Sequence, residues 1–307
     1  MNTLLPEVPF LDVAAAGPVA HARARRPQTL AVRSACLGWL PGGTALARVG
    51  DPLVRKWMSR SGTPYAADIA AIQRDLGHPG VWTLHAAYLF GCTALADEGS
   101  SGPRLRRTLD WPFPGLGRLV ELVRQQGPAG DFINVTWPGF VGVLTATAKG
   151  RFAASINQAP MPWRGREGVG LWSDYARNAL AAWRDGEGLL PEHLLRLVIE
   201  RECRAARSRG VDTVVANAWS EDRAEWRPRV CGEGSPGPNN RARVSALSGW
   251  AGREGTDFAW AAPPVMNACT RLTVELAPTT GAVVVAGWEP DGRGGVAPAT
   301  ATTRYAS

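Results

Sequence analysis

Cys92 and two charged residues that follow it, Arg107 and Asp110, have the side-chain types of a nucleophilic site. A thiol attacks an amide as its thiolate, yet a free cysteine has a pKa near about 8.5 and is mostly protonated at neutral pH. It therefore needs a base to remove its proton and a partner that stabilises the anion. A lone cysteine at a strand start is typically a small buried residue, but the nearby arginine and aspartate favour a catalytic one.

The histidines offer no evident base for this cysteine. The chain has four, at His21, His78, His85 and His193, and none is spaced like the histidine of a papain-type protease. A papain-like mechanism is therefore the less favoured one, and a different base is expected.

Two later segments extend the pattern: residues 134–145 (NVTWPGFVGVLT) and residues 151–160 (RFAASINQAP). Together with Cys92-Thr93 and the Arg107–Asp110 segment, they resemble the N-terminal-nucleophile cysteine hydrolases of the acid ceramidase and N-acylethanolamine amidase family. The choloylglycine hydrolases and penicillin-type acyltransferases are related to that family. The resemblance covers roughly residues 53–288 and implies an α+β fold, an αββα sandwich of two antiparallel sheets between helices.

The resemblance also implies a mechanism. The chain would cut itself between Gly91 and Cys92, and the new α-amine, with a pKa near about 8, would act as the base for the thiol. Gly91 suits such a cut because it carries no side chain and adopts strained backbone conformations. Cys92 would then cleave a linear, non-peptide amide of a small N-acyl amine through a thioester, with no metal or organic cofactor. Acyl transfer to another amine is the chemical alternative.

Individual roles follow from the same resemblance. Asp110 would hold the α-ammonium group by a charge-assisted hydrogen bond, and Arg107 would stabilise the thiolate or a substrate carbonyl. Asn217 would supply an oxyanion-hole donor, a contact that can be worth about 3 kcal/mol. Arg241 matches a late arginine of the family, and Arg243 is the alternative for that role.

Substrate contacts are expected from Trp137, Asn157 and Gln158. Several aromatic residues are predicted to lie in the core, with some of them able to line an acyl pocket: Trp111, Phe113, Trp137, Phe140 and Trp163.

The chain departs from the family pattern in three places. Gln158 stands where the family has a glutamate, and His85 and Leu89 replace a polar pair before the nucleophile. A helix and a strand pair are missing, in an apparent internal deletion near residues 199–212. These departures motivate a second hypothesis, a non-catalytic relative that acts as a binding scaffold.

The composition disfavours several other classes of protein. The 307 residues, 45% of them hydrophobic, suffice for a sizeable core, and the net charge of +7 is spread without a nucleic-acid-binding motif. No apolar run approaches the roughly 18 residues of a membrane helix, and no secretory signal is evident. The odd number of cysteines, without Cys-x-x-Cys spacing, disfavours zinc and disulfides and favours the cytoplasm: Cys36, Cys92, Cys203, Cys231 and Cys269.

Three regions must position these residues. We expect a loosely ordered lead-in over residues 1–30, a mainly helical segment over 31–91 and the catalytic region over 92–307. The helical segment should contain helices at 43–61 and from Thr63-Pro64 to Gly77. The catalytic region should contain strands, with helices at 170–184 and 191–209 and polar loops at 232–240 and 291–299. The predicted strands are 92–96, 119–124, 131–137, 141–145, 152–156, 213–218, 270–276 and 282–288.

Overall fold

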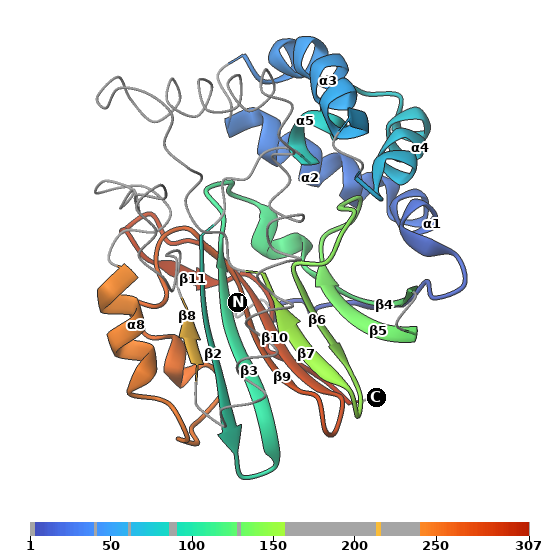
Figure 1. The fold of residues 1–307 in the computed structure, drawn as a ribbon. Helices are drawn as coiled ribbons and strands as arrows, with labels where there is room; N and C mark the ends of the chain where they lie inside the picture. The colour runs from blue at the N-terminus through green and yellow to red at the C-terminus, as the bar shows by residue number, and fades with distance from the viewer. Residues whose placement is uncertain are drawn as a thin grey trace.

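The computed structural model describes residues 4–39, 42–60, 63–85, 91–127, 130–156, 213–215 and 240–306, which form an α+β fold with two sheets (Figure 1). A short strand and five helices come first: β1 (Phe10–Asp12), α1 (Gly17–Ala24), α2 (Arg26–Trp39), α3 (Gly43–Arg60), α4 (Ala66–Leu76) and α5 (Val81–His85).

The smaller sheet has the order β1-β4-β5-β6-β7, and only its β1–β4 pair is parallel. The larger sheet is antiparallel, with the order β11-β10-β9-β3-β2-β8 and β12 also paired to β10. Their strands are β2 (Gly91–Gly99), β3 (Gly102–Asp110), β4 (Glu121–Gly127), β5 (Gly130–Thr136), β6 (Thr145–Ala148), β7 (Phe152–Ser155), β8 (Thr213–Val215), β9 (Thr270–Ala277), β10 (Ala282–Pro290), β11 (Val296–Pro298) and β12 (Thr303–Tyr305).

The main core lies between the two sheets. Alternate side chains of a strand point to opposite faces, and the inward set of β3 and β9 includes Leu109 and Val274. They belong to the same buried cluster as Leu122 of β4 and Val135 of β5. The two sheets therefore share one apolar interior.

The opposite face of the larger sheet is covered by helix α8 (Asn240–Ser248) and the 3-10 turn η2 (Ala259–Ala261). Leu95 of β2 packs there with Leu247 of α8 and Trp260 of η2. The helices α1 to α5 gather at one end of the sheets (Figure 1) and have a cluster of their own, which includes Ile72 of α4 and Trp82 of α5. The predicted helices at 170–184 and 191–209 lie outside the described residues.

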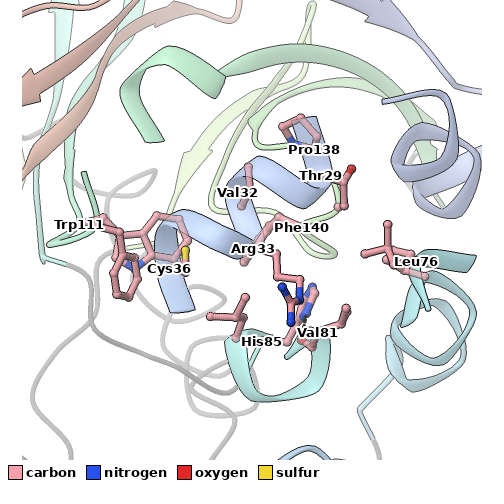
Figure 2. A pocket seen from close by; sticks show the side chains of 14 residues that line it. Thr29, Val32, Arg33, Cys36, Leu76, Val81, His85, Trp111, Pro138 and Phe140 are labelled. Atoms are coloured by element: carbon pink, nitrogen blue, oxygen red, sulfur yellow. Dashed lines mark hydrogen bonds between the residues drawn. The ribbon is translucent and has the colours of Figure 1, made fainter. Parts of the chain in front are cut away.

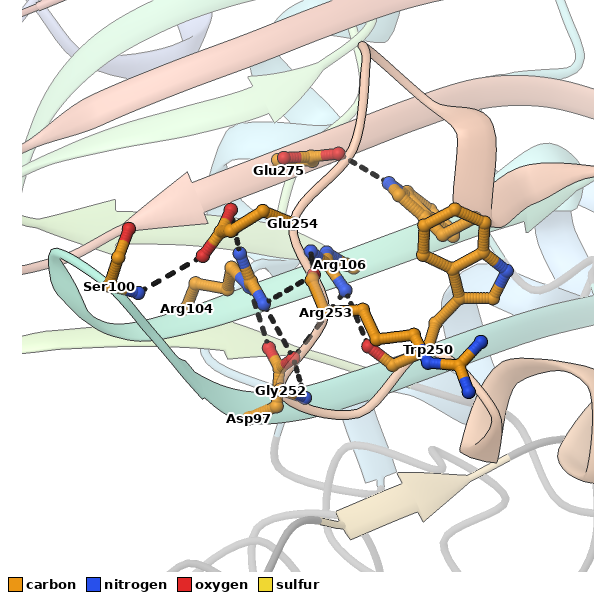
Figure 3. Close-up of polar contacts among 10 residues, drawn as sticks. Asp97, Ser100, Arg104, Arg106, Trp250, Gly252, Arg253, Glu254 and Glu275 are labelled. Atoms are coloured by element: carbon orange, nitrogen blue, oxygen red, sulfur yellow. Dashed lines mark hydrogen bonds and ion pairs between the residues drawn. The ribbon is translucent and has the colours of Figure 1, made fainter.

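A buried ionic network fastens the β2–β3 hairpin to the chain that follows α8 (Figure 3). Arg104 forms two hydrogen bonds of 2.9 Å with Asp97 and reaches Glu254 at 2.7 Å. Arg106 donates to the carbonyl oxygens of Trp250 at 3.1 Å and Arg253 at 2.6 Å. Because both arginines are largely buried and each bonds to more than one acceptor, this network fixes the segment that carries α8 against β2.

The helical segment agrees well with the sequence. α3 confirms the predicted helix at 43–61, and α4 ends at Gly77, whose φ of 69° is left-handed, as predicted. α4 begins at Ala66, a little after Thr63-Pro64. The lead-in differs: residues 1–30 contain β1 and α1, held in place by pairing with β4 and by a buried His21–Glu121 contact of 2.7 Å.

The strand predictions hold except at one place. The expected strand at 141–145 is wrong, because residues 138–144 form a loop in which Gly142 has a φ of 116°. Besides β1, the strands β3, β6 and β12 and the helix α8 were not expected, and β11 lies inside the expected loop at 291–299. None of the helices in the described ranges is long and apolar enough to cross a membrane.

Candidate active site

Cys92 is the second residue of β2, and its side chain points into the core between the sheets. It is fully buried, and its cluster includes Ala94, two residues further along the same face. In the β2–β3 pair, Gly91 at the start of β2 lies opposite Asp110 at the end of β3, and Cys92 lies opposite Leu109. The β2–β3 pairing thus brings the nucleophile candidate to the end of a strand, beside the residues that follow it in sequence.

Arg107 lies beside the thiol on the same inner face. Its Nη2 donates to Cys92 Sγ at 2.9 Å and to the carbonyl oxygen of Ile156 at 2.7 Å. Its Nη1 donates to the carbonyl oxygen of Leu144 at 2.6 Å and to the hydroxyl of Thr145. These acceptors lie at the ends of β6 and β7, the last two strands of the smaller sheet, so one buried guanidinium joins the two sheets at the thiol.

Asp110 is fully buried on the other side of the strand end, where β3 has a register shift. Its Oδ1 accepts from the hydroxyl of Thr270 at 2.7 Å, and its Oδ2 accepts from Asn267 Nδ2 at 2.9 Å. Burial raises the pKa of Asp110, whereas the guanidinium of Arg243 and these two hydrogen bonds favour the ionised form.

Arg243 comes from α8 and completes the site. Its Nη1 donates to Asp110 Oδ2 at 3.0 Å and to Thr93 Oγ1 at 2.9 Å, and lies 3.4 Å from the backbone oxygen of Cys92. Arg243 is 1% exposed. Arg241 lies in the first turn of the same helix, with its side chain outside the described part. The arginine that the structure brings to the aspartate is therefore Arg243, the alternative in the sequence prediction.

The electrostatics of the thiol combine two opposing effects. Burial raises the pKa of Cys92, and the nearby guanidinium of Arg107 opposes that rise by favouring the thiolate. Arg243 acts in the same direction as Arg107, and Asp110 against it. A protonated thiol held by a cation needs only a nearby base to become a nucleophile.

His85 is not that base. Its Nδ1 donates to the carbonyl oxygen of Val81 at 2.7 Å, and its Nε2 accepts from the backbone N–H of Val141 at 2.9 Å. The ring also stacks on Phe140. Burial lowers the pKa of His85, so the neutral ring ties α5 to the loop at 138–144.

Replacing His85 by leucine should lower the free energy of unfolding by about 1–3 kcal/mol above neutral pH, because the Val141 N–H loses its acceptor. The pKa of His85 lies below its ordinary value near about 6.5, so the unfolded chain binds the proton first. The stability that the neutral ring contributes is complete above that value and is lost as the pH falls. Urea unfolding between about pH 5 and pH 8 should show a flatter pH dependence for His85→Leu than for the unchanged protein. Identical slopes would contradict this role.

Trp111, the residue that follows Asp110 in the sequence, lines an apolar pocket (Figure 2). Trp111 forms part of its wall, facing Cys36 and Val32 of α2, Leu84 of α5 and Phe140. The pocket is small, with a cavity volume of about 50 Å³.

Cys36 belongs to this wall rather than to a reactive site. Burial raises the pKa of Cys36 to about 12, which keeps its thiol protonated and inert.

Trp137 supports the pocket from behind. It is 1% exposed, its Nε1 donates to the carbonyl oxygen of Leu116 at 2.8 Å, and its ring meets Trp111 edge-on at 5.1 Å. The expected site residues Asn157, Gln158 and Asn217 lie outside the described residues, as do Leu89, Trp163, His193, the two cysteines Cys203 and Cys231, and the apparent deletion near 199–212.

Three site residues were missed by the sequence analysis: Thr145, Asn267 and Thr270. Thr270 carried a signal, since it opens the predicted hairpin whose first strand pairs with β3, and Thr145 ends the 134–145 segment of the sequence pattern, whereas Asn267 carried none. Across the described ranges, no three His, Cys, Asp or Glu side chains are grouped as a metal site. Comparison of the chain with protein-family models gave no match, and comparison with curated proteins gave none either.

Proposed function

We propose that this protein is a cysteine N-terminal-nucleophile hydrolase that cleaves linear, non-peptide amide bonds of N-acyl amines, on an αββα sandwich. One observation carries the proposal: the fully buried Cys92 at the start of β2, with Arg107 on its sulfur and the Asp110–Arg243 pair beside its backbone. A structural cysteine has no need of two buried arginines and a buried carboxylate, because burying charge is costly.

The strand register supports the choice of cleavage point. Gly91 pairs with Asp110 across the hairpin, so cutting the Gly91–Cys92 bond would leave a new α-amine at the strand end that carries this carboxylate. Asp110 would orient the ammonium form, and the free amine would take the thiol proton, as no histidine is needed for that step.

The reaction then follows from the site. Cys92 Sγ attacks the substrate carbonyl carbon, the α-ammonium returns its proton to the leaving nitrogen, and the carbon–nitrogen bond breaks to give a thioester and a free amine. Water, deprotonated by the same amine, attacks the thioester carbonyl and releases the carboxylic acid and the thiol. Arg107 stabilises the sulfur anion that forms when the amine takes the thiol proton, and again when the sulfur leaves the thioester.

The apolar pocket supports an N-acyl substrate with an uncharged, hydrophobic acyl group. Its wall is formed mainly by Trp111, Phe113, Phe140 and aliphatic side chains, and Arg33, which also lines it, donates its Nε–H to the carbonyl oxygen of Pro79 at 2.5 Å. Such a lining favours apolar chains or rings and disfavours charged ones.

The test is amine release from a panel of N-acyl amines by purified protein, with acyl groups that range from acetyl to long alkyl and to dicarboxylic acyl. We expect release from members with apolar acyl groups, and little from the charged ones. Protein that begins at Cys92 and yet releases amine from no member would overturn the proposal and favour the scaffold hypothesis.

A further inference from the structure

Helix α3 carries an exposed surface that the proposed catalytic function does not use. The helix packs against α2, α4 and α5 through residues such as Ala47 and Met58, and it lies at the end of the molecule away from the sheets (Figure 1). Its outward side bears two stripes, one apolar and one basic.

The apolar stripe consists of Leu46, Val49 and Leu53, which are 49%, 67% and 56% exposed. Residues three and four positions apart lie on one face of a helix, so these side chains form a continuous ridge. Large apolar residues scattered singly on a surface are ordinary, whereas three in a row on one helix face mark a surface that contacts something apolar.

The basic stripe consists of Arg48, Arg55 and Lys56, all exposed, and lies on the flank of α3 between the apolar stripe and the side of the helix that packs against its neighbours. Within the described ranges, none of the three forms an ion pair. They line a broad cleft between α3 and the chain from the end of α4 to α5. Asp51 also lines the cleft, but its carboxylate is occupied by the backbone N–H groups of Gly80 at 2.6 Å and Thr83 at 2.9 Å.

We propose that α3 docks the protein on an anionic phospholipid surface, with Leu46, Val49 and Leu53 in the acyl boundary and a phosphate headgroup held by Arg48, Arg55 and Lys56. A soluble anion would satisfy the cations and leave the apolar ridge in water, and a neutral bilayer would do the reverse. An anionic bilayer pairs with both stripes at once.

The experiment is flotation of the whole protein with vesicles of phosphatidylcholine alone or with added phosphatidylglycerol. We expect binding to the anionic vesicles, weakened by salt. The triple variant Arg48→Gln, Arg55→Gln, Lys56→Gln should lose on the order of 100-fold in partitioning, since each cation near the surface contributes several-fold. The triple Leu46→Ser, Val49→Ser, Leu53→Ser should lose at least about tenfold.

The matched control removes three exposed arginines elsewhere, Arg118→Gln, Arg253→Gln and Arg293→Gln, and should keep most of the binding. The single variant Val49→Asp tests the apolar stripe independently. Because it changes only one exposed residue, the fold should be unaffected, and binding to the vesicles should still weaken.

Three results would overturn the proposal: no binding of the unchanged protein to anionic vesicles, equal losses in the control and the basic-stripe triple, or binding that the apolar triple leaves intact. If the apolar triple variant keeps its binding to vesicles and the protein binds DNA equally well, the surface is a general polyanion site instead.

Discussion

With Cys92 replaced by alanine, we expect the protein to release no detectable amine from N-acyl amines and to stay uncut before residue 92. The expected loss of turnover is on the order of 10⁴-fold or more, the scale for removal of a covalent nucleophile. The fold should survive, because the change removes one sulfur atom and Arg107 keeps its oxygen acceptors at Leu144, Thr145 and Ile156. Turnover by liquid chromatography of the released amine, together with thermal unfolding, measures both effects.

Cys36→Ala is the matched control for this substitution. Cys36 is buried to a similar degree, but it lies in the pocket wall, and burial raises its pKa to about 12. This variant should keep cleavage and most of its turnover. Turnover that persists in Cys92→Ala, or an equal loss in both variants, would contradict a nucleophilic role for Cys92.

Replacing Arg107 by methionine should have the second-largest effect. The substitution keeps the bulk of the side chain and removes the donor that lies 2.9 Å from Cys92 Sγ. A donor of this kind at a reacting anion contributes about 10²–10³ in rate, so kcat/KM should fall by that factor. Because Arg107 holds the pKa of the buried thiol down, the alkaline rise in rate should also move to higher pH.

Arg106→Met is its control, since Arg106 is the next residue of β3 and faces the other side of the sheet (Figure 3). It is also buried, but its partners are Asp97 and the carbonyl oxygens of Trp250 and Arg253. Both variants should lose about 3–5 kcal/mol of unfolding free energy, the usual cost of breaking a buried ionic contact. Only Arg107→Met should shift the pH–rate profile of the folded protein. The same shift in both variants would assign Arg107 a purely structural role.

The elements with a clear hydrophobic period could be predicted from the sequence. α4 places Ile69, Ile72 and Leu76 on its buried face and stops at Gly77, and the β9–β10 hairpin was also expected. Their signals are local, because apolar spacing and a turn residue suffice to define them.

β3 was not predicted because its sequence looks solvated. Arg104, Arg106 and Arg107 follow one another within four positions, yet all three are largely buried in the structure. Their acceptors come from the loop after α8 and from the strands β6 and β7, which no local pattern links to them. A buried charge becomes acceptable only when distant groups satisfy it, and those groups are known only from the fold.

Contacts between residues distant in sequence also explain why some residues of the site were predicted and others were missed. Cys92, Arg107 and Asp110 lie on one hairpin and could be singled out by residue type and spacing. Arg243 reaches Asp110 across 133 positions of sequence, and Asn267 reaches it across 157. In the sequence, the Arg-Ala-Arg segment of α8 resembled a solvated loop, and only the fold shows that Arg243 reaches the buried aspartate.

The intact mass of the denatured protein, after incubation at mildly acidic and at neutral pH, tests the central claim most directly. We expect two masses, one for a fragment that ends at Gly91 and one for a fragment that begins at Cys92, and a single mass for Cys92→Ala. One uncut chain in the unchanged protein under both conditions would contradict it.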